Sequence, residues 1–433
     1  MAKRATIRTY RHGLGDCHLV TLHGKSKSTF RILIDCGVIL GTPDAKAVMT
    51  SVMESIVKDS NGKVDLLVAT HEHWDHVSGF GQAAEVFAKL KVGKVWMAWT
   101  EDPDDKDGQA LAESKGKSLA LLQQAAMHLQ GFGPVEANPL FVSLAEFFGM
   151  AARVTTKGAL EAVRAKAKPG TPRYCDPADK PFDLPAFGAR IYVLGPPRDL
   201  DALKKLNPKT GEGYEHAFKL FEANLEPSLG GVAADKNAPF PVLDSMPVAA
   251  ARGTPFFASN YFEGPSWRRI DADWMLAADG LALALDNMTN NTSLVLAIEL
   301  GGKDVLLFAA DAQVGNWKSW PRCEWTVKGE KVTGEDLLRR TIVYKVGHHG
   351  SHNATLKEGG LELMESLKTA VIPVDEVRAK KMEWGAMPLS ALVTALKKKT
   401  AGKGFILRTD KDLPKGAEAA GIVSTPEYVE ITV

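Results

Sequence analysis

Six consecutive residues, from His71 to His76, constrain this chain more than any other part of its sequence. They read His-Glu-His-Trp-Asp-His and follow directly on the apolar stretch at 64–69. Imidazole nitrogens and carboxylate oxygens suit zinc, manganese or iron(II), but so short a loop cannot aim all of them at one ion. The run therefore predicts a site for two adjacent divalent ions at the end of a strand, with a chance surface cluster as the alternative. The predicted ligands are His71, His73, Asp75 and His76.

The spacing His-x-His-x-Asp-His resembles the metal-binding motif of the metallo-β-lactamase-fold hydrolases. The resemblance implies an α/β protein with a four-layer αββα fold, in which the first two histidines hold one metal and the Asp-His pair holds the other. It also implies a carboxylate that bridges the metals, and Asp311, in the run Phe-Ala-Ala-Asp-Ala, matches that position. The alternative for Asp311 is a cap on the next turn.

A second histidine pair follows the apolar segment at 342–346, in the run Gly-His-His-Gly-Ser. Consecutive side chains that leave a strand point in divergent directions, so one imidazole can bind metal while the other faces the substrate. The sequence leaves open which does which; we assign His349 to the metal and His348 to catalysis. Many relatives supply one more histidine between the motifs, but His128 lies in a helical run and His216 does not leave a strand. One metal is therefore expected to be held weakly.

Further segments narrow the resemblance to the metallo-β-lactamase-like domain of the competence proteins that import DNA. Gly-Leu-Gly-Asp-Cys at 13–17 is similar to their Gly-Gln-Gly-Asp-Ser, and Leu-Ile-Asp-Cys-Gly at 33–37 to their Leu-Ile-Asp-x-Gly. Three later segments follow in the same order, at 290–296, 345–351 and 407–410. The resemblance covers both ends of the chain and skips most of its middle.

Other residues are candidates for supporting roles around the metals. Asp16 and Asp35 are expected near the mouth of the site, where each orients a metal-binding histidine or caps a turn. Lys345 either contacts an anionic substrate or is solvated. Asn291 is a candidate hydrogen-bond partner at the edge of the site. Cys17 either lines the site or packs beneath it, as buried cysteines commonly do.

Strands and helices alternate along the 433 residues, which is typical of a layered α/β protein. We expect one metallo-β-lactamase-like domain over 1–433, with insertions at about 101–189 and 200–287. The expected strands are 5–10, 18–22, 30–34, 64–69, 92–99, 190–194, 293–299, 304–308 and 342–346, and the expected helices are 43–58, 81–90, 111–129 and 214–225.

The composition of the chain limits the classes of protein to which it can belong. With 45% hydrophobic and 24% charged residues the chain can bury a large core. A net charge of +1 provides no broad basic field, so an anionic substrate must be captured locally. No apolar stretch has the length of a signal peptide or a membrane span, so we expect a cytoplasmic protein without membrane contact.

The ligands predict a hydrolase in which two divalent ions, zinc or manganese, hold a shared water as hydroxide. Asp75 or Asp311 would orient that hydroxide, and His348 would bind the anion or protonate the leaving group. A phosphodiester, with nucleic acid implied by the competence resemblance, fits best; another ester, lactone or amide is the alternative. A second class is a non-catalytic partner protein whose insertions bind another polypeptide. The tryptophans at 317, 320 and 325 either stack on bases or belong to the core.

Overall fold

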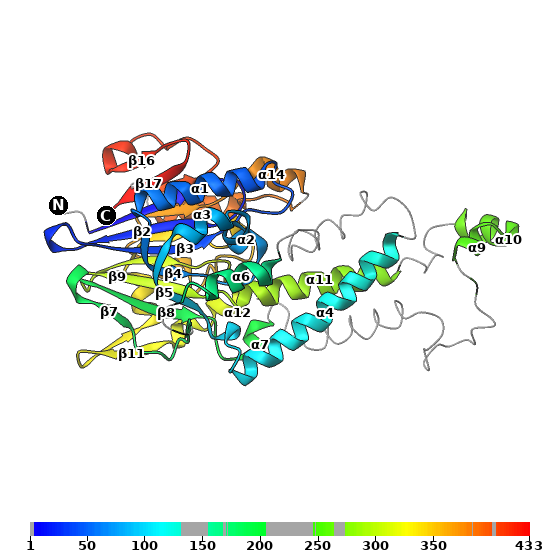
Figure 1. Ribbon diagram of the computed structural model, residues 1–433, viewed down its shortest axis with the longest axis horizontal. Coiled ribbons are helices and arrows are strands. Elements are labelled where there is room, and N and C mark those ends of the chain that lie inside the picture. Colours follow the sequence, from blue (N-terminus) through cyan, green and yellow to red (C-terminus); the bar gives the residue numbers. More distant parts are fainter. Residues whose placement is uncertain are drawn as a thin grey trace. The chain divides into compact units, whose positions relative to one another are not determined.

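The structure, a computed structural model, describes residues 4–130, 155–167, 170, 172–204, 246, 248–263, 273–382, 384–400 and 404–433 (Figure 1). The chain divides into two compact units. The first comprises Met1–Gln109, Ala145–Lys209 and Asn287–Val433, and the second comprises Ala110–Leu144 and Thr210–Asp286. All of the predicted metal ligands belong to the first unit. The helix expected at 214–225 lies outside the described residues.

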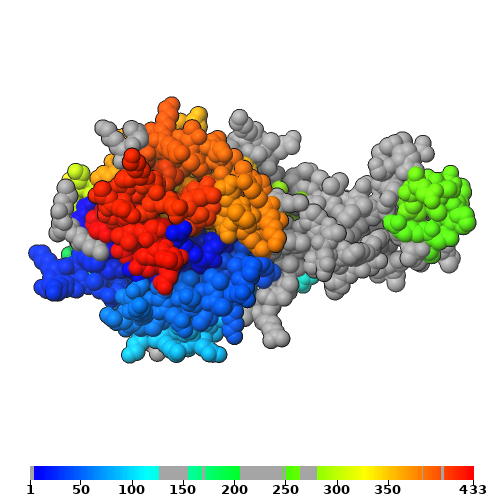
Figure 2. Space-filling model, turned by 90° about the horizontal axis from the view of Figure 1, so that it is seen from above, coloured from blue at the N-terminus to red at the C-terminus, as the bar shows by residue number. Residues whose placement is uncertain are grey.

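The first sheet has eight strands, and it brings the two ends of the chain together. Its first three strands form the expected antiparallel meander, and the next three join it in parallel. The last strand of the chain pairs with the first, with Thr6 opposite Thr432, and Figure 2 shows the C-terminal segment in red against the blue N-terminal part. In spatial order the strands are β16 (Ile422–Ser424), β17 (Tyr428–Thr432), β1 (Ala5–Tyr10), β2 (Cys17–His23), β3 (Thr29–Cys36), β4 (Lys63–Val68), β5 (Lys91–Ala98) and β6 (Arg173–Cys175).

The second sheet has seven strands, and a third, small sheet pairs β11 (Glu324–Val327) with β12 (Glu330–Thr333). In the second sheet β10 and β13 run parallel, with Phe308 opposite Lys345. The segments that follow these two strands therefore leave the sheet at the same edge. In spatial order the strands are β15 (Phe405–Arg408), β14 (Thr369–Ile372), β13 (Thr341–Lys345), β10 (Asp304–Phe308), β9 (Val295–Leu300), β8 (Ala189–Gly195) and β7 (Phe182–Leu184).

The two large sheets face each other, and helices cover their outer faces, so the expected αββα arrangement is confirmed (Figure 1). Alternation along β3 shows this directly, because Ile32 and Ile34 pack between the sheets while Leu33 packs under the helices. The helices on the first sheet are α1 (Ala45–Asp59), α2 (Trp74–Gln82), α3 (Ala84–Lys89) and α6 (Thr156–Arg164), and those on the second are α12 (Val314–Trp317), α13 (Gly334–Arg339), α14 (Glu376–Lys381) and α15 (Ser390–Lys399).

The remaining α-helices described are divided between the two units. Both α4 (Lys106–Gln130) and α11 (Asp273–Asn291) have residues in each unit, because α4 starts in the first unit and α11 ends there. Three shorter helices are α7 (Leu200–Leu203) in the first unit, and α9 (Val248–Arg252) and α10 (Pro255–Phe257) in the second. Of the two stretches that the sequence marks as insertions, the second unit takes in residues 110–144 of the first and 210–286 of the second, while β6 and β7 of the first stretch belong to the large sheets.

The helix expected at 81–90 is wrong in its start, and this difference affects the metal motif. The structure has two helices there, and α2 already begins at Trp74. Glycines have low helix propensity, so the pair at 79 and 81 hides this helix from a reading of apolar periodicity. Gly79 is needed because a Cβ atom there would lie 2.7 Å from the sulfur of Cys36. Asp75 and His76 therefore belong to a first helical turn packed tightly on β3, and not to a free loop.

Candidate metal centre

Four of the predicted ligands meet where α2 begins and where β10 and β13 end. His76 Nε2 lies 3.1 Å from Asp311 Oδ2 and 3.8 Å from Asp75 Oδ2. His349 Nε2 lies 2.8 Å from Asp75 Oδ2. One ligand atom from each residue falls within 4.8 Å of the others, and all four side chains are buried. We call Asp75, His76, Asp311 and His349 the four-ligand cluster.

The backbone that aims the second-sheet ligands is unusual. Ala310 has φ of 46°, His348 of 40° and His349 of 52°, a region that residues other than glycine seldom adopt. Such conformations cost about 1–3 kcal/mol each and persist where the surroundings determine them, commonly at functional sites. Here they turn the chain sharply after β10 and after β13, so that Asp311 and His349 face the start of α2.

His71 and His73 lie beside the four-ligand cluster as a pair. His71 Nε2 is 3.0 Å from His73 Nδ1, and the ring of His71 is 4.2 Å from the ring of His76, measured between centroids. Within the described parts of the chain, neither histidine belongs to a group of three or more closely spaced candidate ligands. His216 and the side chain of His128 fall outside that description. The pair thus offers two ligands where the cluster offers four.

Asp35 fixes the orientation of His76 in the four-ligand cluster. Its Oδ2 accepts hydrogen bonds from His76 Nδ1 at 2.8 Å and from the Thr70 hydroxyl at 2.7 Å, while its Oδ1 accepts one from the Thr70 N–H at 2.8 Å. A bond at Nδ1 leaves Nε2 of His76 as the atom that faces the other ligands. This is the arrangement in which a carboxylate orients a ligand histidine.

The glycines of the first two motifs hold the start of α2. A Cβ atom on Gly37 would lie 2.5 Å from the carbonyl carbon of Asp75, and one on Gly15 would lie 2.8 Å from the Asp75 oxygen. Between them, the N–H of Asp16 donates to that same oxygen at 3.0 Å. Only glycine permits so close a backbone approach. The motif residues therefore position Asp75 through the main chain.

The charges of the cluster favour a bound cation. Burial alone raises the pKa of the Asp311 carboxyl, but the charges of His76 and Lys345 hold it well below its usual range. Burial likewise lowers the pKa of His76, yet Asp311 and Asp75 raise it well above the usual value. Nε2 of His76 is buried and makes no hydrogen bond, although it lies 3.1 Å from a carboxylate oxygen. The His76 nitrogen and the Asp311 oxygen face each other, as two ligands of one divalent ion would.

The structure separates the two adjacent histidines. His349 joins the four-ligand cluster, and its Nδ1 is fixed by the Pro373 carbonyl at 2.8 Å. His348 is only partly buried, and its Nδ1 lies 3.0 Å from the Ser351 hydroxyl and 3.4 Å from the Gln313 amide. Burial lowers the pKa of His348 below its usual value. At neutral pH this imidazole is uncharged, at the edge of the cluster and outside it.

Asn291 is connected to Asp311 through Asn316 and Ser293. Its amide donates to the Leu203 carbonyl and its oxygen accepts from the Asn316 N–H, both at 3.1 Å. The Asn316 amide in turn donates to the Ser293 carbonyl, and the Ser293 hydroxyl accepts from the Asp311 N–H at 3.2 Å. Asn316 and Ser293 therefore support Asp311, and the sequence carries no motif that identifies Asn316.

The tryptophans and Cys17 belong to the core. All three tryptophan side chains are buried in the hydrophobic core between the second sheet and its helices. Each indole N–H donates a hydrogen bond to another group of the protein. Stacking on bases is therefore contradicted for Trp317, Trp320 and Trp325. Cys17 is fully buried among the residues between the first sheet and its helices, so it packs beneath the site.

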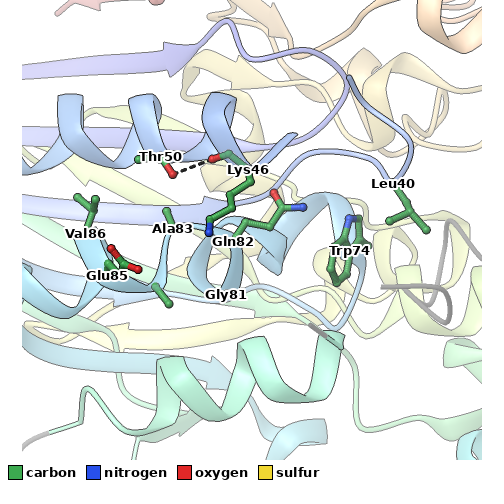
Figure 3. Close-up of a pocket in the computed structure, with 10 residues that line it drawn as sticks. Leu40, Lys46, Thr50, Trp74, Gly81, Gln82, Ala83, Glu85 and Val86 are labelled. Atoms are coloured by element: carbon green, nitrogen blue, oxygen red, sulfur yellow. Dashed lines mark hydrogen bonds between the residues drawn. The ribbon is translucent and has the colours of Figure 1, made fainter. Parts of the chain in front are cut away.

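Trp74, the residue between His73 and Asp75, faces a separate cavity of about 390 Å³ (Figure 3). The Gln82 side chain extends between Lys46 and Trp74 in this cavity, which lies between α1 and the pair α2 and α3. The residues that line it are Leu40, Lys46, Thr50, Trp74, Gly81, Gln82, Ala83, Ala84, Glu85 and Val86, and they include no predicted ligand.

Comparison with known families agrees with this geometry. Residues 12–139 match the metallo-beta-lactamase superfamily, a segment that includes the motif from His71 to His76. That superfamily consists mostly of metal-dependent hydrolases, and the clustered histidines and aspartates can hold a metal. No curated protein matches the chain in a sequence comparison. The match reaches the superfamily, so the narrower likeness to competence proteins is carried by the sequence motifs alone. Of the helices described, none combines the length and apolarity that crossing a membrane requires.

Proposed function

We propose that this protein is a metal-dependent phosphodiesterase whose substrate is nucleic acid or a nucleotide-like molecule. The four-ligand cluster carries the proposal, because two carboxylates and two imidazoles from both sheets converge there in a buried site. We further propose two divalent ions, zinc or manganese. The cluster would hold one, and His71 with His73 would hold the other, with Asp311 as the shared ligand.

Ions held there supply Lewis-acid catalysis and activate water at neutral pH. The protein contributes position and proton transfer. Asp75 and Asp311 remain carboxylates, because nearby histidines keep their pKa values below the usual range. Asp75 or Asp311 can accept a hydrogen bond from an attacking water. The N–H of His348, which is neutral and partly exposed, can donate to a phosphate oxygen or to the leaving oxygen.

The choice of a phosphodiester rests on two supports. The competence-type segments at 13–17, 33–37 and 345–351 favour nucleic acid by resemblance. Two cations also suit phosphoester cleavage, since they neutralise the charge of the transition state. Another ester, lactone or amide could use the same ligands, so a substrate panel is needed to distinguish these classes.

The test combines metal analysis with turnover. Protein purified without chelator should contain divalent metal and should hydrolyse bis-p-nitrophenyl phosphate, single-stranded DNA, RNA or a dinucleotide when manganese or zinc is added. His349→Ala should abolish both properties, whereas His352→Ala, an exposed histidine of the same segment, should change neither. Turnover of lactones or lactams without any phosphodiester cleavage would contradict the substrate class. Absence of metal and turnover in the natural protein would favour the non-catalytic role as a protein partner, with contacts through 101–189 and 200–287.

A further inference from the structure

Lys345, the last residue of β13, is a buried cation. Its side chain is 3% exposed, which excludes both of the roles that the sequence suggests for it, solvation and contact with a substrate. Burying an ammonium group costs several kcal/mol unless nearby acceptors compensate. A lysine in this position therefore needs partners within the protein.

Three acceptors surround the Lys345 ammonium group. It forms an ion pair with Asp16 Oδ2, donates to the Ala310 carbonyl at 2.9 Å, and lies 3.5 Å from Asp311 Oδ1. An ammonium group has three N–H donors and no acceptor. The donors and the neighbouring acceptors thus match in number.

These partners come from both large sheets. Asp16 lies between β1 and β2, and its N–H holds the carbonyl of Asp75. Ala310 and Asp311 follow β10 of the second sheet. Lys345 therefore joins the segment that positions Asp75 to the segment that carries Asp311.

The two oxygens of the Asp311 carboxylate have different neighbours, and Lys345 lies on the side of Oδ1. Oδ1 accepts from the His348 N–H at 3.1 Å and faces Lys345, whereas Oδ2 faces His76 Nε2 at 3.1 Å. One oxygen is occupied by protein donors, and the other is directed into the four-ligand cluster. Without Lys345, the Asp311 carboxylate would lose the ammonium group that faces Oδ1, and it could rotate.

We propose that Lys345 is a positioning residue whose ammonium group clamps Asp16 to Asp311 and leaves the other oxygen of Asp311 for metal binding. The inference rests on the proposed metal-dependent function. A competing view assigns Lys345 only an electrostatic effect, in which its charge repels metal ions. The two views predict opposite changes in metal affinity when Lys345 is replaced, because loss of the clamp weakens metal binding and loss of the repulsion strengthens it.

The test uses Lys345→Met, which keeps the length and removes the charge, and Lys345→Arg, which keeps the charge. Lys303→Met, at an exposed lysine in the turn after β9, is the matched control. Co²⁺ serves as the probe, because its visible absorption reports the number and geometry of its ligands. We expect Lys345→Met to bind Co²⁺ about 10- to 100-fold more weakly, the range for lost supporting contacts, with an altered spectrum. Lys345→Arg should restore part of both, and Lys303→Met should match the natural protein.

Equal or tighter Co²⁺ binding by folded Lys345→Met, with an unchanged spectrum, would overturn the clamp. If that variant does not fold, Asp16→Asn releases the same clamp from its other end, and an unchanged spectrum there would be equally decisive. A natural protein that binds no Co²⁺ contradicts the proposed function itself, whereas a natural protein that binds it normally isolates the outcome to Lys345.

Discussion

The four-ligand cluster and the His71–His73 pair differ in the number and origin of their candidate ligands. In the cluster, His76 is fixed by Asp35, His349 by a main-chain carbonyl, and Asp311 by neighbours on its other oxygen. In the pair, both ligands come from one short segment, with His71 Nε2 3.0 Å from His73 Nδ1, and His71 Nδ1 lies 3.0 Å from the Thr70 hydroxyl. The cluster thus offers four candidate ligands and the pair offers two. We therefore expect one tight and one weak metal position, as the sequence predicts from the lack of a further histidine.

The largest effect should follow from His76→Ala, which removes the centre of the cluster. The substitution deletes a ligand and leaves Asp35, Asp75 and Asp311 without their shared cation. Removal of one partner from a buried charge pair costs about 3–5 kcal/mol. We expect loss of tight metal binding and a destabilised protein in chelator at pH 6, measured by urea unfolding. A variant with normal stability and tight binding would remove the basis for the comparison.

His73→Ala should instead affect the weak position alone. The change removes one of only two ligands in the pair, so metal content should fall from two ions to one, and most phosphodiesterase activity should disappear. Unfolding in chelator should change little, because the cluster is intact. Metal analysis after dialysis measures this directly. Loss of both ions would show that the two positions are not separable in this way.

Asp35→Asn sharpens the comparison by loosening the cluster without removing a ligand. An amide can still accept a hydrogen bond from His76 but carries no charge. Loss of such a supporting contact weakens metal affinity about 10- to 100-fold. Competition with a chromophoric chelator measures the change. An unaltered affinity would mean that His76 is oriented by other contacts.

The stability of the metal-free protein should depend on pH, because the four-ligand cluster contains both histidines and carboxylates. Carboxylates raise the pKa of His76 and of His349 above the usual value, near 6.5. The resulting stabilisation is fully present below about pH 6.5 and is lost as pH rises through the raised values. Asp75 and Asp311 have lowered pKa values, so their contribution is lost in acid. Unfolding in chelator should therefore become easier above neutral pH, while added zinc should stabilise increasingly there because metal ligands must be deprotonated. A metal-free protein that gains stability steadily up to pH 9 would contradict this sign.

His348→Ala should have the smallest effect on metal binding. His348 lies outside the cluster and touches Ser351 and Gln313. We expect unchanged metal content with a lower kcat, because a hydrogen bond to the developing charge acts mainly in the transition state. His349→Ala provides the contrast, since it should lose metal as well. A metal deficit in His348→Ala would show that the two histidines share the ligand role.

The candidate ligands can be recognised in the sequence because they occur in short runs with characteristic spacing. The run from His71 to His76 and the two histidines after β13 need no tertiary information to be noticed. The residues alone leave open how His348 and His349 divide their roles, because the direction of each side chain depends on left-handed backbone at both positions. The role of Lys345 was also hidden. Its partners at 16 and 310 become neighbours only when the two sheets face each other.

Local signals also explain how well the fold could be predicted. The nine expected strands contain β-branched or apolar runs, and the structure has each of them within about two residues of its expected bounds. No expectation covers the strands β6, β7, β11, β12 and β14 to β17, most of which are short. The start of α2 cannot be predicted from propensity, because Gly79 is required by a close approach to Cys36 of β3. Insertions remain a prediction from pattern changes along the sequence.

The pairing of β1 with β17 has a consequence for how the chain is made. Thr6 leaves the ribosome long before Thr432, its partner in the sheet, so the hydrogen-bonding edge of β1 stays open through most of synthesis. Contacts between residues so distant in sequence also slow folding. An open strand edge is a template for pairing with other chains. A protein shortened before β17 would keep every candidate ligand and still expose β1 permanently, so its main failure would be self-association during expression.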